Sequence, residues 1–151
     1  LDWADTSRVM AMTDHLSGDD RLVQYAASMV AEHGTLFLVH VEDEAVFGRY
    51  MDVISKIPDI DTEPTRTLIR ERLMRDASDY VTSCADALAD QPITLVAEIC
   101  FGHYLSVYQD LITQNEVDLL VLNTKDDDQL AMHGLAYSLA VELRHVPLLM
   151  L

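Results

Sequence analysis

The side chains best suited to chemistry in this sequence are carboxylates and histidines gathered in three short segments. They are Asp14, His15, Asp19 and Asp20, then His103, and then Asp126, Asp127 and Asp128. Several carboxylate oxygens close together suit a hard divalent cation. Their spacing matches neither an EF-hand loop nor a zinc motif, so we expect a solvated acidic rim and assign no metal. The run at 126–128 is the weak metal candidate.

No serine or cysteine stands in a pattern typical of a nucleophile. Ser17, Ser106 and Ser138 lie nearest the predicted loops or last helix, but none belongs to a G-x-S-x-G elbow. Cys84 and Cys100 lie in apolar surroundings without metal-like spacing, as expected for reduced, buried thiols of a cytoplasmic protein. We therefore assign no catalytic residue and expect that the chain is not an enzyme.

The charge of the chain excludes several classes of partner. There are 10 basic and 26 acidic residues among 151, giving a formal net charge of −16. Binding to nucleic acid or to an anionic membrane surface needs clustered Lys and Arg, so neither is expected. Hydrophobic residues make up 50% of the chain, enough for a core. No apolar run reaches the ~20 residues of a membrane span, so no membrane insertion is expected.

Strand-like and helix-like segments alternate along the chain and would position these side chains. Apolar runs predict strands at 8–13, 35–41, 93–99, 118–123 and 146–151. Helical spacing predicts one helix from a capping box at Ser17 and Asp20 to a C-cap at Gly34, and others at 62–90, from Gly102 through Ile112, and at 130–145. The alternation predicts an α/β fold, an open five-stranded parallel sheet with helices on both faces.

Two segments fall outside this regular pattern. Residues 1–7 are interpreted as an N-terminal extension or linker, and 8–151 as a single domain. Residues 42–61 are predicted as a short helix or an ordered loop. The part Phe47–Ile57 is more apolar than a solvated loop needs, so it either packs over the sheet edge or contacts another chain. In such sheets ligands bind beyond the carboxyl ends of the strands, which directs attention to loops 14–18, 41–44, 100–103 and 123–129.

Several short segments, taken in order, resemble the universal stress protein (UspA-like) family. They are Val9–Ser17 with Thr13-Asp14, His40-Val41, Gly102, Asp118–Val121, and Gly134 with Leu143–Leu151. The resemblance extends from Arg8 to Leu151. It implies an adenine nucleotide alpha-hydrolase-like fold with strand order 3-2-1-4-5, and a homodimer through the fifth strands.

The last segment independently favours such a dimer. Val146, Leu148, Leu149 and Met150 are apolar on both faces of the predicted final strand. An exposed apolar edge strand promotes aggregation unless it is covered, and pairing with a second copy about a two-fold axis would cover it.

Many members of this family bind ATP or AMP through a glycine loop after the fourth strand, and this sequence departs from that loop. Asn123 stands at the first glycine, Asp126 about at the second, and Leu135 replaces the hydroxyl residue after Gly134. Each carboxylate about 4 Å from a phosphate would cost on the order of 4 kcal/mol at an effective dielectric near 20. We therefore expect no resident cofactor, and weak or lost ATP and AMP binding.

The nucleoside end of the family's ligand could still be recognised. The resemblance places a nucleoside crevice at Thr13, Asp14, His40, Val41, Gly102, His103, Asn123 and Gly134. The sequence thus predicts a non-catalytic regulatory or stress-response domain. Three alternatives stay open: a cytosolic regulatory domain of a larger protein such as a membrane transporter, consistent with a start at Leu1 without Met; an adenine nucleotide or nucleoside sensor; and a weak nucleotide hydrolase.

Overall fold

One parallel sheet of five strands forms the centre of the molecule. The structure is a computed structural model that describes residues 6–13, 20–124 and 134–151. The strands are β1 (Arg8–Thr13), β2 (Thr35–Asp43), β3 (Thr94–Gly102), β4 (Leu119–Leu122) and β5 (Leu148–Met150). They lie in the order β3-β2-β1-β4-β5, and every neighbouring pair is parallel. The predicted fold class and strand order are confirmed.

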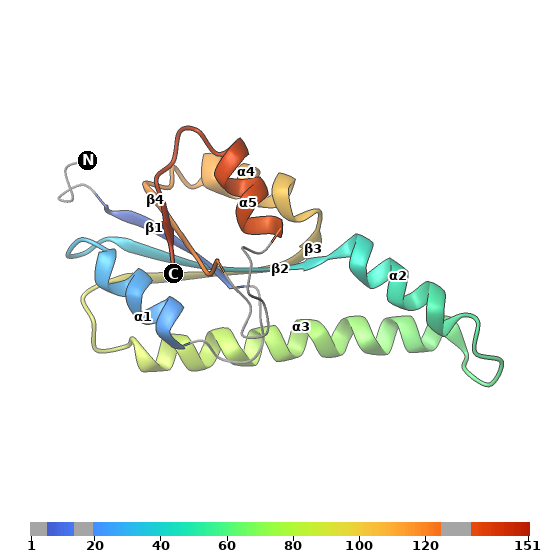
Figure 1. Cartoon of the computed structure of the whole chain (residues 1–151). Helices are drawn as coiled ribbons and strands as arrows, with labels where there is room; N and C mark the ends of the chain where they lie inside the picture. The colour runs from blue at the N-terminus through green and yellow to red at the C-terminus, as the bar shows by residue number, and fades with distance from the viewer. Residues whose placement is uncertain (1–5, 14–19, 125–133) are drawn as a thin grey trace.

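Helices cover both faces of this sheet, as Figure 1 shows. They are α1 (Asp20–Met29), α2 (Glu44–Ile54), α3 (Thr62–Ala87), α4 (Tyr104–Gln114) and α5 (Gly134–Glu142). The helices α1 and α3 lie on one face, and α4 and α5 lie on the other. The helix α2 continues past the end of β2, and α3 then runs back along the sheet. In the ranges described, no helix is both long enough and apolar enough to cross a membrane.

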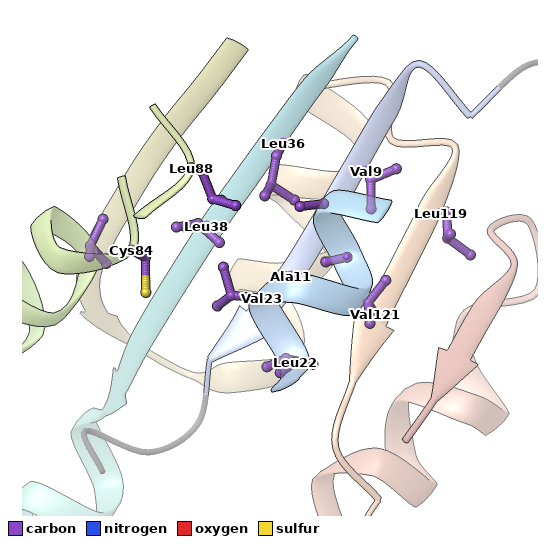
Figure 2. Packing of buried hydrophobic residues seen from close by; sticks show 13 residues of the cluster. Val9, Ala11, Leu22, Val23, Leu36, Leu38, Cys84, Leu88, Leu119 and Val121 are labelled. Carbon is purple, nitrogen blue, oxygen red and sulfur yellow. The ribbon is translucent and has the colours of Figure 1, made fainter. Parts of the chain in front are cut away.

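Two hydrophobic clusters hold these layers together because the strands are apolar on both faces. Successive side chains of a strand point to opposite faces. Val9 and Ala11 therefore pack with Leu22, Val23 and Leu88 beneath the sheet, in the cluster drawn in Figure 2. Alternate residues fill the other cluster, which comprises Met10, Met12, Phe37, Val39, Val41, Tyr108, Ile112, Val117, Leu120, Leu122, Ala136 and Leu139. A sheet covered on both faces is what continuous apolar strands predict.

The first helix ends earlier than predicted, and Gly34 is not its C-cap. The helix stops at Met29 because the N–H of Ala31 donates to the carbonyl of Thr6 at 2.9 Å. The left-handed residue is His33, with φ of 65°. Gly34 is required for space, since a Cβ there would lie 2.7 Å from the Ser7 oxygen and 2.9 Å from the Ala31 oxygen. Thr6 and Ser7, within the predicted extension, thus contact this turn.

Other boundaries differ because the sheet extends further on one side. The strand β3 continues to Gly102, where the prediction ended it at Ile99 and let Gly102 open a helix. Pairing of Gly102 with Asp43 lengthens both strands. The residues 42–61 contain a true helix, α2, whose N-cap Asp43 accepts hydrogen bonds from the next turn. At the other edge, the last helix ends at Glu142, before the predicted residue 145, and the last strand spans only Leu148–Met150.

Candidate crevice at the carboxyl ends of the strands

The carboxyl ends of β1, β2 and β4 bring together residues from three distant parts of the sequence. Thr13, the last residue of β1, lies beside His40 of β2. On its other side Met12 pairs with Leu122, so Asn123 follows at the level of Thr13. The strand order reverses between β1 and β4, which is where open parallel sheets bind ligands.

A buried hydrogen-bonded network lies at this point. His40 has only 3% of its surface exposed. Its Nδ1 lies 3.0 Å from the carbonyl oxygen of Thr13, and its Nε2 lies 2.8 Å from Oε1 of Glu42. The hydroxyl of Thr13 donates to the carbonyl of Val39 at 2.9 Å. The network therefore fixes the ends of β1 and β2 against each other.

Both ring nitrogens of His40 face oxygen acceptors. The Nδ1 atom faces a backbone carbonyl, and the Nε2 atom faces the carboxylate of Glu42. The carboxylate of Glu42 is partly exposed, at 20%, so it connects this buried network to the surface. The arrangement can hold and orient a proton or a hydrogen-bond donor at the rim.

Sequence reasoning found His40 and Thr13 but missed Glu42 as a partner. Residues two apart on a strand share a face, so the spacing of His40 and Glu42 was an available signal. Val41, between them, points to the opposite face and is fully buried. On that face the hydroxyl of Tyr108 donates to the Val39 carbonyl at 3.2 Å.

The other predicted crevice residues lie on β3, α4 and α5 and directly after β4. Gly102 ends β3, on the far side of β2, and His103 is the exposed N-cap of α4, without a side-chain capping bond. Gly134 begins α5. Asn123 is half-buried, and the next residue, Thr124, binds the carbonyl of Leu151 through both its N–H and its hydroxyl. The chain after β4 is thereby fastened to the end of β5.

The remaining candidates lie outside the described residues. These are Asp14 and the acidic run Asp126, Asp127 and Asp128, together with the central part of the glycine-loop replacement. Within 6–13, 20–124 and 134–151, no group of three or more His, Cys, Asp or Glu side chains is placed to hold a metal ion.

Positive charge is scarce among the described residues at this edge of the sheet. Among the described residues on the strand ends and directly after them, none is Lys or Arg. One cation reaches β3 from α3: the guanidinium of Arg70 lies 4.0 Å from the ring centroid of Phe101. The same side chain lies 4.0 Å from Glu44. Arg70 is thus held over an aromatic ring near β3, away from the end of β4.

The two cysteines give no sign of a reactive thiolate. Cys84 is buried in the core and Cys100 is half-buried, so the prediction that both are buried was wrong for Cys100. Desolvation raises the pKa of the Cys100 thiol, and the negative charge of Glu98 raises it further. A thiol with a raised pKa stays protonated and is a poor nucleophile.

Comparison with known proteins gives a structural answer only. No protein-family model matches this sequence, and no curated protein matches it. The solved structure of the hypothetical protein MJ0577 superposes with a TM-score of 0.74 at 12% identity, over 97% of this chain and 96% of the other. Universal stress protein UspA from Lactobacillus plantarum gives 0.65 at 16% identity, over 97% and 99%.

A universal stress protein family member from Burkholderia pseudomallei gives a TM-score of 0.58 at 15% identity, over 97% of both chains. The chain has the universal stress protein fold. The likeness covers nearly the whole chain and confirms the fold that the sequence motifs implied. Because one fold hosts many functions, the function must be argued from the site.

Within the universal stress protein fold, the crevice of this chain has its own chemistry. Its described polar groups are a hydroxyl, an imidazole, a carboxylate and an amide, from Thr13, His40, Glu42 and Asn123. These groups can exchange hydrogen bonds with a neutral, polar ligand. They provide no fixed positive charge for a polyphosphate.

Proposed function

We propose that this chain is a non-catalytic regulatory domain, of the stress-response type, whose crevice accepts a nucleoside weakly and does not retain ATP. The fold shared with proteins named universal stress proteins supports the regulatory role. The observation that carries the ligand preference is the chemistry of the strand ends, where Glu42 and Asn123 reach the rim and the described residues include no Lys or Arg.

The electrostatics of this edge favour a neutral ligand over a charged one. A carboxylate such as that of Glu42 repels phosphate oxygens, while it can accept a hydrogen bond from a ribose hydroxyl. The −16 net charge of the chain adds a long-range repulsion that salt screens. Affinity should therefore fall from adenosine to AMP to ATP.

Isothermal titration with adenosine, AMP and Mg·ATP tests this order. We expect adenosine to bind in the high micromolar range or weaker and ATP to bind at least about tenfold more weakly, as expected for one unfavourable charge contact of about 1.4 kcal/mol. The variant Glu42→Gln should reduce the difference in affinity between adenosine and ATP. The variant Glu44→Gln, which alters a neighbouring exposed carboxylate, should leave that difference unchanged. Sub-micromolar ATP binding would contradict the proposal, as would phosphate release with Mg²⁺ or Mn²⁺.

We also propose a homodimer through the last strand. The segment Val146, Leu148, Leu149 and Met150 is half-buried on the outer strand of the sheet. The preceding helix presents exposed apolar side chains, Tyr137 at 63% and Val141 at 47%. An apolar outer strand and exposed apolar side chains on the preceding helix support pairing with a second copy.

A further inference from the structure

A hollow lies between α2 and α3, and it borders the crevice at Glu42. It has a volume of about 380 Å³ and is lined mainly by apolar and aromatic side chains. Those that shape it are Phe47, Tyr50 and Met51 of α2, Ile69 and Leu73 of α3, and Tyr104 of α4. The crevice residues Thr13, His40, Val41 and Asn123 do not line it, whereas Glu42, which pairs with His40 in the crevice, does. Its volume is that of a small-molecule site, roughly 300–1,000 Å³.

The walls of this hollow are held in place by packed side chains. Phe47 and Met51 are buried, and the ring of Phe47 meets that of Phe101 edge to face with 5.4 Å between centroids. Arg70 covers the same Phe101 ring. The N-terminus of α2 is fixed by Asp43, whose Oδ1 accepts hydrogen bonds from the N–H groups of Ala45 at 2.8 Å and Val46 at 2.9 Å. The hollow is therefore preformed on one wall.

The polar part of the lining is acidic. Glu42 and Asp43, consecutive at the end of β2, are its charged lining residues, and neither Lys nor Arg lines it. The contacts given for Glu42 and Asp43 use one oxygen of each carboxylate, Oε1 toward His40 and Oδ1 in the cap. The second oxygen of each can accept a hydrogen bond from a ligand.

We propose that this hollow binds a small amphipathic cation, with an apolar or aromatic body between α2 and α3 and an ammonium group beside Glu42 and Asp43. An apolar wall with the acidic residues Glu42 and Asp43 in its lining selects a ligand that has both parts. The same carboxylates reject an anion of the same shape. This ligand class differs from the nucleoside proposed for the crevice. The two sites share Glu42, but the apolar walls on α2 and α3 belong to this hollow alone.

The direct test compares three probes by NMR titration of the whole chain. They are 4-phenylbutylamine, 4-phenylbutanoate with the same apolar body and opposite charge, and butylamine with the charge but no ring. We expect saturable binding of 4-phenylbutylamine, at least about tenfold tighter than of either control, with shifts at residues of α2 and α3. Equal binding of amine and acid would overturn the proposal, as would equal binding of butylamine, which would indicate attraction to the acidic surface alone.

Paired variants locate the site. Ile69→Trp should fill the hollow and weaken 4-phenylbutylamine binding more than tenfold, while Leu68→Trp changes an exposed neighbour on α3 and should not. Asp43→Asn keeps an N-cap side chain and should weaken binding about fivefold, against no change for Asp52→Asn on the exposed side of α2. Unchanged binding in both Ile69→Trp and Asp43→Asn would overturn the proposal.

Adenosine serves as the competitor that separates the two sites. We expect saturating adenosine to leave 4-phenylbutylamine affinity unchanged, whether or not adenosine itself binds. Because Glu42 borders both sites, the competition is repeated in Glu42→Gln. Displacement of the amine by adenosine in both the wild type and this variant would show that one site serves both, and would overturn the separate pocket. If adenosine binds and 4-phenylbutylamine does not, the proposal for the hollow has failed. If 4-phenylbutylamine binds and adenosine does not, the proposal for the crevice has failed.

Discussion

Single side chains decide how the strand ends are held and what they can bind. His40 is the clearest case, because it is buried at 3% exposure and both its ring nitrogens have oxygen neighbours within 3.0 Å. If the ring were removed, the buried carbonyl of Thr13 would lose this partner, while the carboxylate of Glu42 is partly exposed. A buried polar group without a partner destabilises the fold by more than a typical hydrogen bond stabilises it.

Removal of this ring is the first prediction at the residue scale. His40→Ala should lower the free energy of unfolding by about 2–3 kcal/mol, from the lost hydrogen bonds and the cavity left behind. Urea denaturation monitored by circular dichroism gives the value. His145→Ala, at an exposed position, should change it by less than about 0.5 kcal/mol. Equal effects of the two substitutions would mean that the network contributes nothing.

Two glycines offer a second, matched test. A Cβ at Gly34 would lie 2.7 Å from a backbone oxygen of Ser7, while a Cβ at Gly48 meets nothing within 4 Å. Gly34→Ala should therefore destabilise by about 2 kcal/mol. Gly48→Ala, inside α2, should stabilise by up to about 0.8 kcal/mol from helix propensity. Thermal unfolding of both variants measures the difference, and a stabilising Gly34→Ala would contradict the predicted steric conflict.

At the scale of elements, the helix α2 contributes most to the proposed binding surfaces outside the sheet. It follows β2 directly and, with α3, extends past the sheet (Figure 1). Its inward side chains Phe47 and Met51 are buried, while Tyr50 and Val53 are exposed at 67% and 61%. The segment Phe47–Ile57 is more apolar than a solvated loop needs, and some of these apolar residues pack against the rest of the molecule. The rest forms one side of the hollow and an apolar outer surface.

The start of α2 can be tested against the start of α3. Asp43 caps α2 with two hydrogen bonds, whereas Asp61 occupies the same position of α3 and makes none with its side chain. Asp43→Ala should lower the free energy of unfolding by about 1 kcal/mol and Asp61→Ala by a few tenths, since only the first loses a cap. Denaturant titration of both variants measures the free energy of unfolding. A larger decrease for Asp61→Ala than for Asp43→Ala would contradict the assignment of Asp43 as the side chain that caps its helix.

At the scale of the whole molecule, the excess negative charge and the apolar edge act against each other. The net charge of −16 makes two copies repel, while Val146–Leu151 contains no charged side chain. Salt screens the repulsion between exposed charges but leaves the apolar contact in place. Association through β5 should therefore strengthen as salt rises.

Light scattering after size exclusion tests the proposed dimer. We expect a mass near twice 17.0 kDa at micromolar concentration. The fraction of dimer should increase from low to physiological salt. Tyr137→Glu should shift the protein to monomer, because it puts a charge among the exposed apolar side chains of α5, the helix that precedes β5. Tyr25→Glu alters a similarly exposed tyrosine on α1 and should not. A monomer mass at all salt concentrations would exclude this interface.

The sequence by itself determined the fold class and the succession of elements. Apolar runs such as Thr35–Val41 and amphipathic segments such as α3 depend on local periodicity, which is independent of distant residues. The predicted strand β1, Arg8–Thr13, matches the observed one. Element ends were less well predicted, because they depend on competition from remote groups, as when Thr6 takes the N–H of Ala31 and ends α1.

Only the tertiary structure decided which side chains meet. Thr13 and His40 touch because β1 and β2 pair in one register, and a shift by a single residue would turn every side chain to the other face. Gly102 and His103 lie on the far side of β2 because β3 and β1 pair with opposite edges of β2. The hollow between α2 and α3 also needs Ile69 and Tyr104 from distant segments. Periodicity gives each element its apolar face, but the packing of those faces creates the sites.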